Sequence, residues 1–359
     1  MIKNNYKVIG IMSGTSLDGL DLAFCNFEVI EGQWSYKLYF SKSVTYDKSL
    51  MQDLKNSFHL PSIELLSLNN KYGRWLGEQI NEFVSENDIQ IDFVSSHGHT
   101  VFHQPEDGIT YQIGSGQEIA NICKTKVIND FRTLDVSLGG QGAPLVPIGD
   151  KYLFSEYDFC LNLGGISNIS FEDNEKRMAY DIGIANMVLN HLTIPQGLSF
   201  DNNGDIAKSG KRCEDLFNQL NQLSYYKQPF PKSTGYEWFK DKVMPIVDNS
   251  EEQFKDKLCT CVHHIAYQIA KEVKKSSKPK GRLLITGGGA NNTFLVETIQ
   301  HYLDDKIEVV IPDKSIINFK EAIVFAFMGV LRYRNEINCL KSVTGSSKDS
   351  STGVIYNPN

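Results

Sequence analysis

The chain has 359 residues, of which 41% are hydrophobic and 22% charged, and its formal charge at pH 7 is −7. This composition is that of a globular protein long enough for two domains, and its negative charge argues against a general nucleic-acid binder, which needs a basic face. No apolar run reaches membrane-spanning length and the N-terminal residues lack the apolar core of a signal peptide, so we expect a cytoplasmic protein without a membrane partner.

The first part of the chain is predicted to form strands and then helices. Alternating apolar and polar residues indicate strands, and apolar residues three or four positions apart indicate helices. In chain order, these patterns predict strands at 7–12, 20–29 and 34–45, a helix at 63–87, a strand at 93–96, a short helix at 117–123 and a strand at 126–129. The glycine- and proline-rich stretch 130–147 is predicted to be irregular and to pass between two domains.

The second part of the chain repeats this order of strands before helices. It is predicted to contain strands at 159–163, 169–171 and 177–180, a helix at 251–275, a strand at 281–286, a helix at 292–303, a strand at 309–311 and a helix at 318–334. Two such runs predict a duplicated α/β unit. We expect one domain to contain residues 1–132 with 341–359, and the other to contain residues 133–340.

Three glycine-rich turns lie at or after predicted strands, at 9–21, 162–168 and 286–292. Glycine lets backbone N–H groups approach phosphate oxygens, and neighbouring hydroxyl and amide groups complete such a cradle. Three turns far apart in the sequence therefore predict one nucleotide held by two halves of the protein. The alternative is three ordinary tight turns, in which Gly and Asn are the common residues. The sequence contains neither a P-loop motif nor the full dinucleotide fingerprint.

Three aspartates near the turns are candidates for site chemistry. Asp18 and Asp21 flank Gly19, and a nucleotide-bound Mg²⁺ takes only one or two carboxylates. We therefore regard Asp18 as the candidate Mg²⁺ ligand, while an aspartate that accepts hydrogen bonds from its own turn is the alternative. Asp181 ends a predicted strand just before Gly183, where its carboxylate could project from the sheet. From the residues alone, capping the helix predicted to follow is the commoner use of an aspartate at such a position.

Basic side chains near the end of the first part are candidates for substrate binding. His97, His99 and His103 invite a zinc hypothesis, but no acidic fourth ligand stands at a typical spacing, and Pro105 indicates a loop. A hydrogen bond from His97 to a sugar or to nearby backbone is better supported. Arg132 follows a predicted strand, and its guanidinium suits a carboxylate or phosphate; a surface ion pair is the alternative.

Several motifs, in order from one end of the chain to the other, carry a family resemblance. They are Met12-Ser13-Gly14-Thr15-Ser16-Leu17-Asp18-Gly19-Leu20-Asp21, Ser96-His97-Gly98-His99-Thr100, Asp130-Phe131-Arg132, the glycine-rich run 139–147, Asn162 to Asn168, Lys232-Ser233-Thr234-Gly235, Gly287-Gly288-Gly289-Ala290-Asn291-Asn292 and Ser342-Val343-Thr344-Gly345. Together they resemble the anhydro-N-acetylmuramic acid kinases, which belong to the superfamily of sugar kinases, acetate kinases, actin and chaperone ATPases. One loop departs from the family pattern, since Asp181-Ile182-Gly183-Ile184-Ala185-Asn186 stands where Asp-Thr-Gly-Pro-Gly-Asn is usual.

The resemblance implies a fold and a set of site residues. The fold is an α/β, two-domain actin-like ATPase (ribonuclease H-like) fold, with a duplicated mixed sheet and helices around a central nucleotide cleft. Asp181 would be the catalytic base, Asp18 would contact Mg²⁺, and His97, Arg132, Gln141 and Gly142 would bind the sugar. ATP would be bound by Gly14, Thr15, Ser16, Asp18, Gly19, Asp21, Gly164, Gly165, Asn168, Gly287, Gly288, Gly289 and Asn291.

The resemblance also implies a reaction. Water would attack the anomeric carbon of a 1,6-anhydro amino sugar from cell-wall recycling, and the freed oxygen would attack the γ-phosphate of ATP. The altered loop at Asp181 leaves open a kinase of the same fold for another sugar. A nucleotide-binding switch or scaffold is the alternative outside sugar chemistry, and the sequence leaves a homodimer open.

Overall fold

The computed structural model describes residues 3–14, 17–276, 278 and 280–359. Two compact units make up the chain, one containing Met1–Leu153 with Phe319–Asn359 and the other containing Phe154–Asn318. The predicted domain boundaries differ from this division, because residues 133–153 and 319–340 belong to the first unit. Residues 319–340 belong there because they pack on its sheet, where Gly10 lies directly against Ala322, and residues 133–153 belong there because they pack on residues 319–340, where Gly149 lies directly against Val324.

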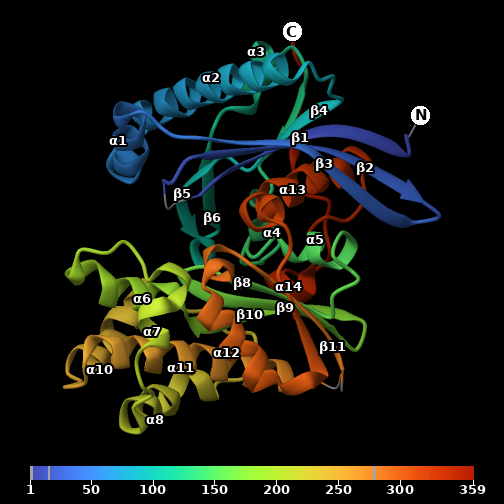
Figure 1. Cartoon of the computed structure of the whole chain (residues 1–359). Helices are drawn as coiled ribbons and strands as arrows, with labels where there is room; N and C mark the ends of the chain where they lie inside the picture. The colour runs from blue at the N-terminus through green and yellow to red at the C-terminus, as the bar shows by residue number, and fades with distance from the viewer. Residues whose placement is uncertain (1–2, 15–16, 277, 279) are drawn as a thin grey trace. The chain divides into compact units, whose positions relative to one another are not determined.

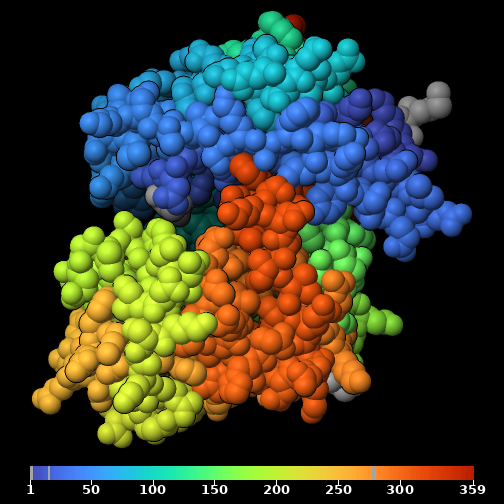
Figure 2. Space-filling view, viewed as in Figure 1, coloured from blue at the N-terminus to red at the C-terminus, as the bar shows by residue number. Residues whose placement is uncertain are grey.

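The first unit contains a six-stranded mixed sheet with the order β13-β7-β4-β1-β2-β3. β1 pairs antiparallel with β2 and parallel with β4, and β4 pairs parallel with β7. The strands are β1 (Asn5–Ser13), β2 (Leu20–Ile30), β3 (Gln33–Val44), β4 (Phe93–Ser96), β7 (Lys126–Asn129) and β13 (Val354–Tyr356). The edge strand β3 belongs to the blue N-terminal segments, which cover much of the face of the first unit seen in Figure 2.

Helices cover both faces of this sheet (Figure 1). On one face, buried residues of β1 and β2 share a core with α1 (Lys48–Asn56), α2 (Ser62–Asn87) and α3 (Gly116–Cys123). On the other face lies α13 (Lys314–Tyr333), which starts in the second unit. Two glycines allow α13 to approach the strands, since a Cβ at Gly10 would lie 2.7 Å from Ala326 Cβ and one at Gly329 would lie 2.6 Å from Ser95 Cβ.

The segments between these elements contain structure that the sequence patterns did not predict. A separate two-stranded hairpin is formed by β5 (His99–Gln104) and β6 (Ile109–Ile113). The stretch predicted to be irregular contains α4 (Thr133–Ser137) and the start of α5 (Pro147–Tyr152). The remaining short elements of the unit are α14 (Lys341–Thr344) and the 3-10 turns Ser57–His59 and Pro105–Asp107.

The second unit contains a five-stranded mixed sheet with the order β10-β9-β8-β11-β12. Its strands are β8 (Phe159–Leu163), β9 (Ile166–Asp173), β10 (Lys176–Ile184), β11 (Gly281–Thr286) and β12 (Ile307–Val310). β8 pairs antiparallel with β9 and parallel with β11, as β1 does with β2 and β4. The two sheets therefore share one plan, and the predicted duplicated α/β unit is confirmed.

Helices of the second unit pack on this sheet around one apolar core. The longest are α11 (Phe254–Lys274) and α12 (Thr293–Leu303). The other helices are α6 (Asn186–Thr193), α7 (Asp205–Lys208), α8 (Glu214–Gln222), α9 (Tyr236–Trp238) and α10 (Met244–Asp248). Short 3-10 turns lie at Ile194–Gln196, Asn202–Gly204, Ser224–Lys227, Gly288–Asn291 and Asp304–Lys306, and a π-helical turn at Phe239–Val243. In the described part of the chain, no helix is both long and apolar enough to span a membrane.

Candidate functional site

The first glycine turn joins β1 to β2. Leu17 N–H donates to the carbonyl of Gly14 at 3.3 Å, which closes the turn. Thr15 and Ser16, which were predicted to bind nucleotide, lie outside the described residues. Gly19 is required by the fold, because its φ is +148° and a Cβ there would lie 2.7 Å from the carbonyl oxygen of Val44.

The two aspartates of this turn differ in environment. Asp18 is exposed, whereas Asp21 is partly buried in β2 and accepts a hydrogen bond from Ser43 Oγ at 2.5 Å. Burial raises the pKa of Asp21, the Ser43 hydrogen bond lowers it, and the neighbouring charge of Asp18 raises it. A cation next to these two carboxylates would relieve their repulsion, so the donor set fits a nucleotide-bound Mg²⁺ that takes one or two carboxylates.

The other two glycine turns come together in the second unit. The turn at Gly164 and Gly165 follows β8, and the turn at 287–289 follows the parallel neighbour β11, in which Thr286 pairs with Asn162. A Cβ at Gly289 would lie 2.6 Å from Leu163 Cβ. Both turns therefore leave from the same end of adjacent strands, as two parts of one phosphate site would.

The glycines of these turns differ in whether the fold itself requires them. Gly287 has a φ of +82°, and a Cβ there would lie 2.9 Å from the carbonyl oxygen of Leu163. A Cβ at Gly165 would meet no atom closer than Met187 Cε at 3.5 Å, and one at Gly288 would have nothing within 4 Å. Packing therefore does not require glycine at 165 or 288, and a ligand close to the backbone would be one physical reason for glycine there.

The start of α6 fixes the direction of the Gly164-Gly165 turn. The N–H of Asn186 donates to the carbonyl of Gly164 at 3.1 Å, and the N–H of Ala185 donates to that of Gly165 at 2.8 Å. Asn186 Nδ2 also donates to the carbonyl of Leu163 at 3.0 Å. Because C=O and N–H point in opposite directions in a trans peptide, the Gly165 N–H points away from α6, and Gly165 is exposed.

A row of polar residues crosses the second sheet from Asp181 to these turns. Asp181 on β10 pairs with Asn168 on β9, Asn168 pairs with Asn162 on β8, and Asn162 pairs with Thr286 on β11. Paired residues on adjacent strands lie on the same face of a sheet. Strand pairing therefore connects Asp181 and Asn168 to the strands that lead into both glycine turns. Asn291 lies in the 3-10 turn Gly288–Asn291 and donates from Nδ2 to the carbonyl of Gly288 at 3.3 Å.

Asp181 was predicted to end a strand, but in the structure it lies within β10, which continues to Ile184. The ladder between β10 and β9 shifts between Asp181 and Gly183, so Ile182 is an extra residue in β10. Such bulges turn a side chain to a new direction and are common beside active sites. The helix-cap alternative is wrong, because α6 begins at Asn186 and its cap position is Ala185, without a side-chain cap.

The carboxylate of Asp181 is instead held by a separate segment. Asp181 Oδ2 accepts hydrogen bonds from Ser233 Oγ at 2.9 Å and from the N–H of Thr234 at 3.1 Å. Burial raises the pKa of Asp181, and the bonds from Thr234 and Ser233 oppose that rise. A carboxylate with a raised pKa is a stronger base than a fully hydrated one. The Oγ1 of Thr234 is buried and has no hydrogen-bond partner in the structure, which leaves a polar group available beside the base.

In the first unit, three of the predicted sugar-binding residues contact one another. Arg132 donates from Nε to His97 Nε2 at 3.0 Å, and from Nη1 to the carbonyl of Gly142 at 2.6 Å. His97 Nδ1 donates to the carbonyl of Gly98 at 2.9 Å, so its Nε2 is a free acceptor for Arg132. Burial and the charge of Arg132 hold the pKa of His97 well below its usual value, which matches this neutral tautomer.

Burial also lowers the pKa of Arg132 to about 10, with the charge of Glu321 opposing. The guanidinium therefore stays charged at neutral pH, and it has five N–H groups, so donors remain for an anionic ligand.

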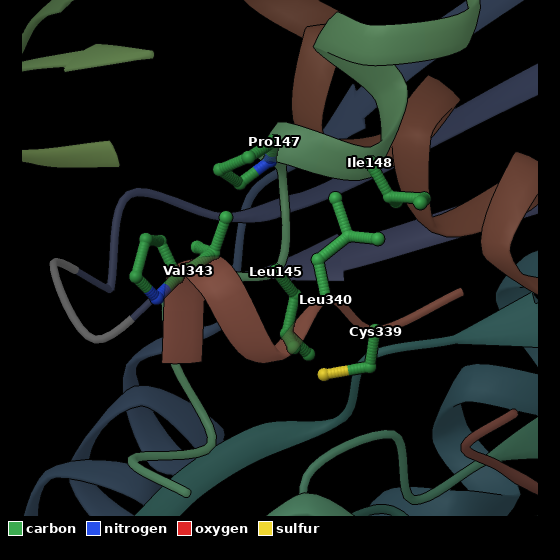
Figure 3. A pocket seen from close by; sticks show the side chains of 7 residues that line it. Leu145, Pro147, Ile148, Cys339, Leu340 and Val343 are labelled. Carbon is green, nitrogen blue, oxygen red and sulfur yellow. The ribbon is translucent and has the colours of Figure 1, made fainter. Parts of the chain in front are cut away.

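Asp135, which was not chosen as a candidate from the sequence, holds Gly142 and Thr344, and Thr344 in turn holds Gln141. Asp135 is fully buried; its Oδ2 accepts from Gly142 N–H at 2.8 Å and its Oδ1 from Thr344 Oγ1 at 2.8 Å. Gln141 N–H donates to the carbonyl of Thr344 at 2.8 Å, while its side chain is exposed. Beside this link, apolar side chains of the 144–148 and 339–343 segments line a small pocket (Figure 3). The loop that carries Gly142 is thus tied to the C-terminal segment.

The three histidines of the zinc hypothesis have different partners. His99 Nδ1 lies 3.3 Å from Ser13 Oγ, and His103 Nδ1 lies 3.1 Å from Thr110 Oγ1. Ser13 Oγ also lies 2.8 Å from the hydroxyl of Tyr46, which ties the first glycine turn to the core. In the described ranges, no group of three His, Cys, Asp or Glu side chains is arranged to hold a metal ion.

Comparison with known proteins places this geometry in a family. The family described as "Anhydro-N-acetylmuramic acid kinase" matches residues 6–358. The chain belongs to the anhydro-N-acetylmuramic acid kinase family. Proteins of that name from Francisella tularensis subsp. novicida and Aliivibrio fischeri are each 33% identical to it, and each alignment covers 98% of this chain and at least 99% of the relative. A third, from Sulfurimonas denitrificans, is 30% identical over 97% of this chain and 98% of the relative.

Membership of the anhydro-N-acetylmuramic acid kinase family confirms the predicted family, the α/β fold class and the assignment as a sugar kinase. Three positions were not chosen as site residues from the sequence. Ser233 and Thr234 hold the carboxylate of Asp181, and Asn162, two strands away, continues the polar row. The motif Lys232-Ser233-Thr234-Gly235 was a sequence signal for the first two, but nothing local in the sequence connected it to Asp181.

Proposed function

We propose that the protein is an ATP-dependent kinase that hydrolytically opens 1,6-anhydro-N-acetylmuramic acid and phosphorylates its O6, giving N-acetylmuramic acid 6-phosphate and ADP. Family membership supports the substrate, and the hydrogen-bonded, partly buried carboxylate of Asp181 supports the chemistry. In this reaction water adds to C1 while the C1–O6 bond breaks, and O6 then attacks the γ-phosphate as the bond to the β-phosphate oxygen breaks.

Asp181 is the proposed base that takes a proton from the attacking water. Its Oδ2 is occupied by the Ser233 and Thr234 donors, which orient the carboxylate and leave Oδ1 for the water. A base must be deprotonated to accept a proton, so activity should require the charged form of Asp181. Burial raises the pKa of Asp181 toward neutral pH, which makes its carboxylate a stronger base.

The other proposed residues bind ATP, the sugar and Mg²⁺. The backbone N–H groups of the turns at Gly14, Gly165 and Gly288 would bind the phosphates of ATP. Arg132, fixed by His97 and the carbonyl of Gly142, would hold the lactyl carboxylate of the sugar by a charge-assisted hydrogen bond. Asp18, with Asp21 nearby, would hold Mg²⁺ on the nucleotide, and that ion when bound would neutralise charge on the transferred phosphate.

Product analysis of wild type and Asp181→Asn tests this function. Wild type with ATP and 1,6-anhydro-N-acetylmuramic acid should yield ADP and the opened 6-phosphate. Asp181→Asn should lose about 10²- to 10⁴-fold in kcat, while the exposed control Asp241→Asn should not. Wild type without product on this sugar, but with product on another, would favour the alternative of a different sugar substrate, for which Ile182, Ile184 and Ala185 of the altered loop are the motivation. Turnover of Asp181→Asn within about threefold of wild type would refute the base role.

A further inference from the structure

A buried lysine stands in the otherwise exposed segment that holds the proposed base. Of residues 227–233, all of which the structure describes, Lys232 alone is buried, with 2% of its side chain exposed. Burying an ammonium group costs free energy unless it is paired, and the side chain could reach water from a loop of this kind. The position of Lys232 therefore calls for a reason beyond loop packing.

The ammonium group of Lys232 is held in an aromatic and acidic pocket. Its Nζ lies 3.4 Å from Oε1 of Glu272 on α11, whose side chain is 1% exposed. Nζ also lies 4.9 Å from the ring centre of Tyr225 and 6.0 Å from that of Tyr180, where cation–π attraction adds to the ion pair. Tyr180 itself donates from its hydroxyl to Glu272 Oε2 at 3.1 Å.

The pocket and the proposed base are joined through the main chain. The N–H of Asp181 donates to the carbonyl of Lys232 at 3.1 Å, and the hydroxyl of Tyr225 donates to the carbonyl of Asp181 at 2.7 Å. Tyr180, which precedes Asp181, shares Glu272 with Lys232. The two donors to Asp181 Oδ2, from Ser233 and Thr234, directly follow Lys232 in the chain.

We propose that Lys232 and Glu272 are positioning residues for the reaction: their buried ion pair fixes the segment 232–234 so that Ser233 and Thr234 hold the Asp181 carboxylate in the direction of the attacking water. This inference rests on the proposed base role of Asp181. Lys275 provides a built-in comparison. It pairs with the same Glu272 carboxylate, at 2.8 Å, but its side chain is 48% exposed, and it directly follows α11 in the chain instead of preceding the two donors to Asp181.

The test compares Lys232→Met with Lys275→Met in steady-state kinetics with ATP and 1,6-anhydro-N-acetylmuramic acid. Lys232→Met should lower kcat by about 10- to 100-fold, because small misplacements of a catalytic group have effects of this size, and should leave KM for ATP within about twofold. Lys275→Met should keep kcat within about twofold of wild type. In an Asp181→Asn background, Lys232→Met should slow the reaction by no more than about twofold further, because both changes act through one carboxylate.

A second readout does not depend on turnover. The pKa of the Asp181 carboxyl, followed by carbon NMR, should be higher in Lys232→Met than in wild type and in Lys275→Met, because Asp181 loses donors that stabilise its charged form. Tyr225 and Lys232 are the titratable groups that contact Asp181 or its segment. The titratable groups around Lys232 are Glu272, Tyr180, Lys275 and Lys271.

The outcomes separate this inference from the proposed function. If Lys232→Met does not fold, Glu272→Gln, which keeps the shape of the side chain, takes its place with the same expected results. Unchanged kcat and unchanged Asp181 pKa in the folded variant, or a loss that adds in full to that of Asp181→Asn, would overturn the positioning role. Wild type that fails to turn over the anhydro sugar would refute the proposed function alone, and the NMR titration would still decide whether Lys232 positions Asp181.

Discussion

Replacing single glycines by alanine separates glycines that serve a ligand from those that serve the fold. At Gly165 an added Cβ would have its nearest neighbour at 3.5 Å, an ordinary van der Waals distance, and φ is not in the left-handed region. Gly165→Ala should therefore change the free energy of unfolding by less than about 1 kcal/mol, and the effect could be stabilising because alanine restricts the unfolded chain.

Gly287→Ala is the matched control from the adjacent turn. Its φ of +82° and ψ of 170° lie in a region that is essentially restricted to glycine, which costs a residue with a Cβ about 1–3 kcal/mol. The Cβ would also lie 2.9 Å from the carbonyl group of Leu163, so either the turn or β8 must move. We therefore expect a loss of about 2 kcal/mol or more in the free energy of unfolding.

Gly165→Ala should affect nucleotide affinity much more than it affects stability. If the Gly165 N–H binds a phosphate, a methyl group there should weaken binding of an ATP analogue at least about tenfold, or about 1.4 kcal/mol. Isothermal calorimetry and thermal denaturation on the same samples measure both quantities. A Gly165→Ala protein with wild-type affinity would refute the ligand explanation for this glycine.

Two further predictions concern buried polar groups. Burial lowers the pKa of His264 to about 3 from about 6.5 in the unfolded chain; the unfolded state then binds the extra proton below pH 6.5, so stability is full above that pH and falls as the pH drops toward 3. Between pH 6.5 and 4, His264→Gln should therefore lose about 3 kcal/mol less free energy of unfolding than wild type does. Urea unfolding at both pH values checks this, and the same loss in the variant as in wild type would contradict it. Asp135→Asn should place an N–H₂ group among the donors Gly142 N–H, Thr344 Oγ1 and Cys339 Sγ and lower stability by about 1–3 kcal/mol, with a raised KM for the sugar because Gly142 also binds Arg132. Denaturation and sugar-dependent kinetics within error of wild type would count against the role of Asp135.

Elements with a strong local pattern were predictable from the sequence. The strands β4, β7, β8 and β11 begin and end at the predicted residues, because short apolar runs next to turn residues define both ends. The hairpin β5–β6 was missed, since its residues are mostly half-exposed and show no clear alternation. The domain boundaries were misplaced because the contact between Gly10 and Ala322, more than 300 residues apart, leaves no local signal.

Candidate site residues could be proposed from the sequence where the residue type itself suggests the chemistry, but not where a role depends on a contact made only in the folded chain. The glycines of the turns, Arg132 and Asp181 could be chosen from composition, spacing and the family motifs. The bulge at Ile182 could not, because register between strands is set by tertiary pairing. The same holds for Ser233 and Asp135, each of which acts on a residue that only the folded chain brings close.

The second unit is one uninterrupted segment, Phe154–Asn318, inserted into the sequence of the first. During synthesis, the strands β1 to β4 and β7 leave the ribosome before this segment, but α13 and β13, which complete that sheet, leave after it. At translation rates of about 5–20 residues per second, the delay is on the order of ten seconds or more. Throughout that interval the surface around Gly10 and Ser95 that α13 later covers, and the edge of β7, have no native partner. Nascent chains of this protein should therefore depend on chaperones more than their final stability suggests, and the second unit should be the first to become resistant to protease.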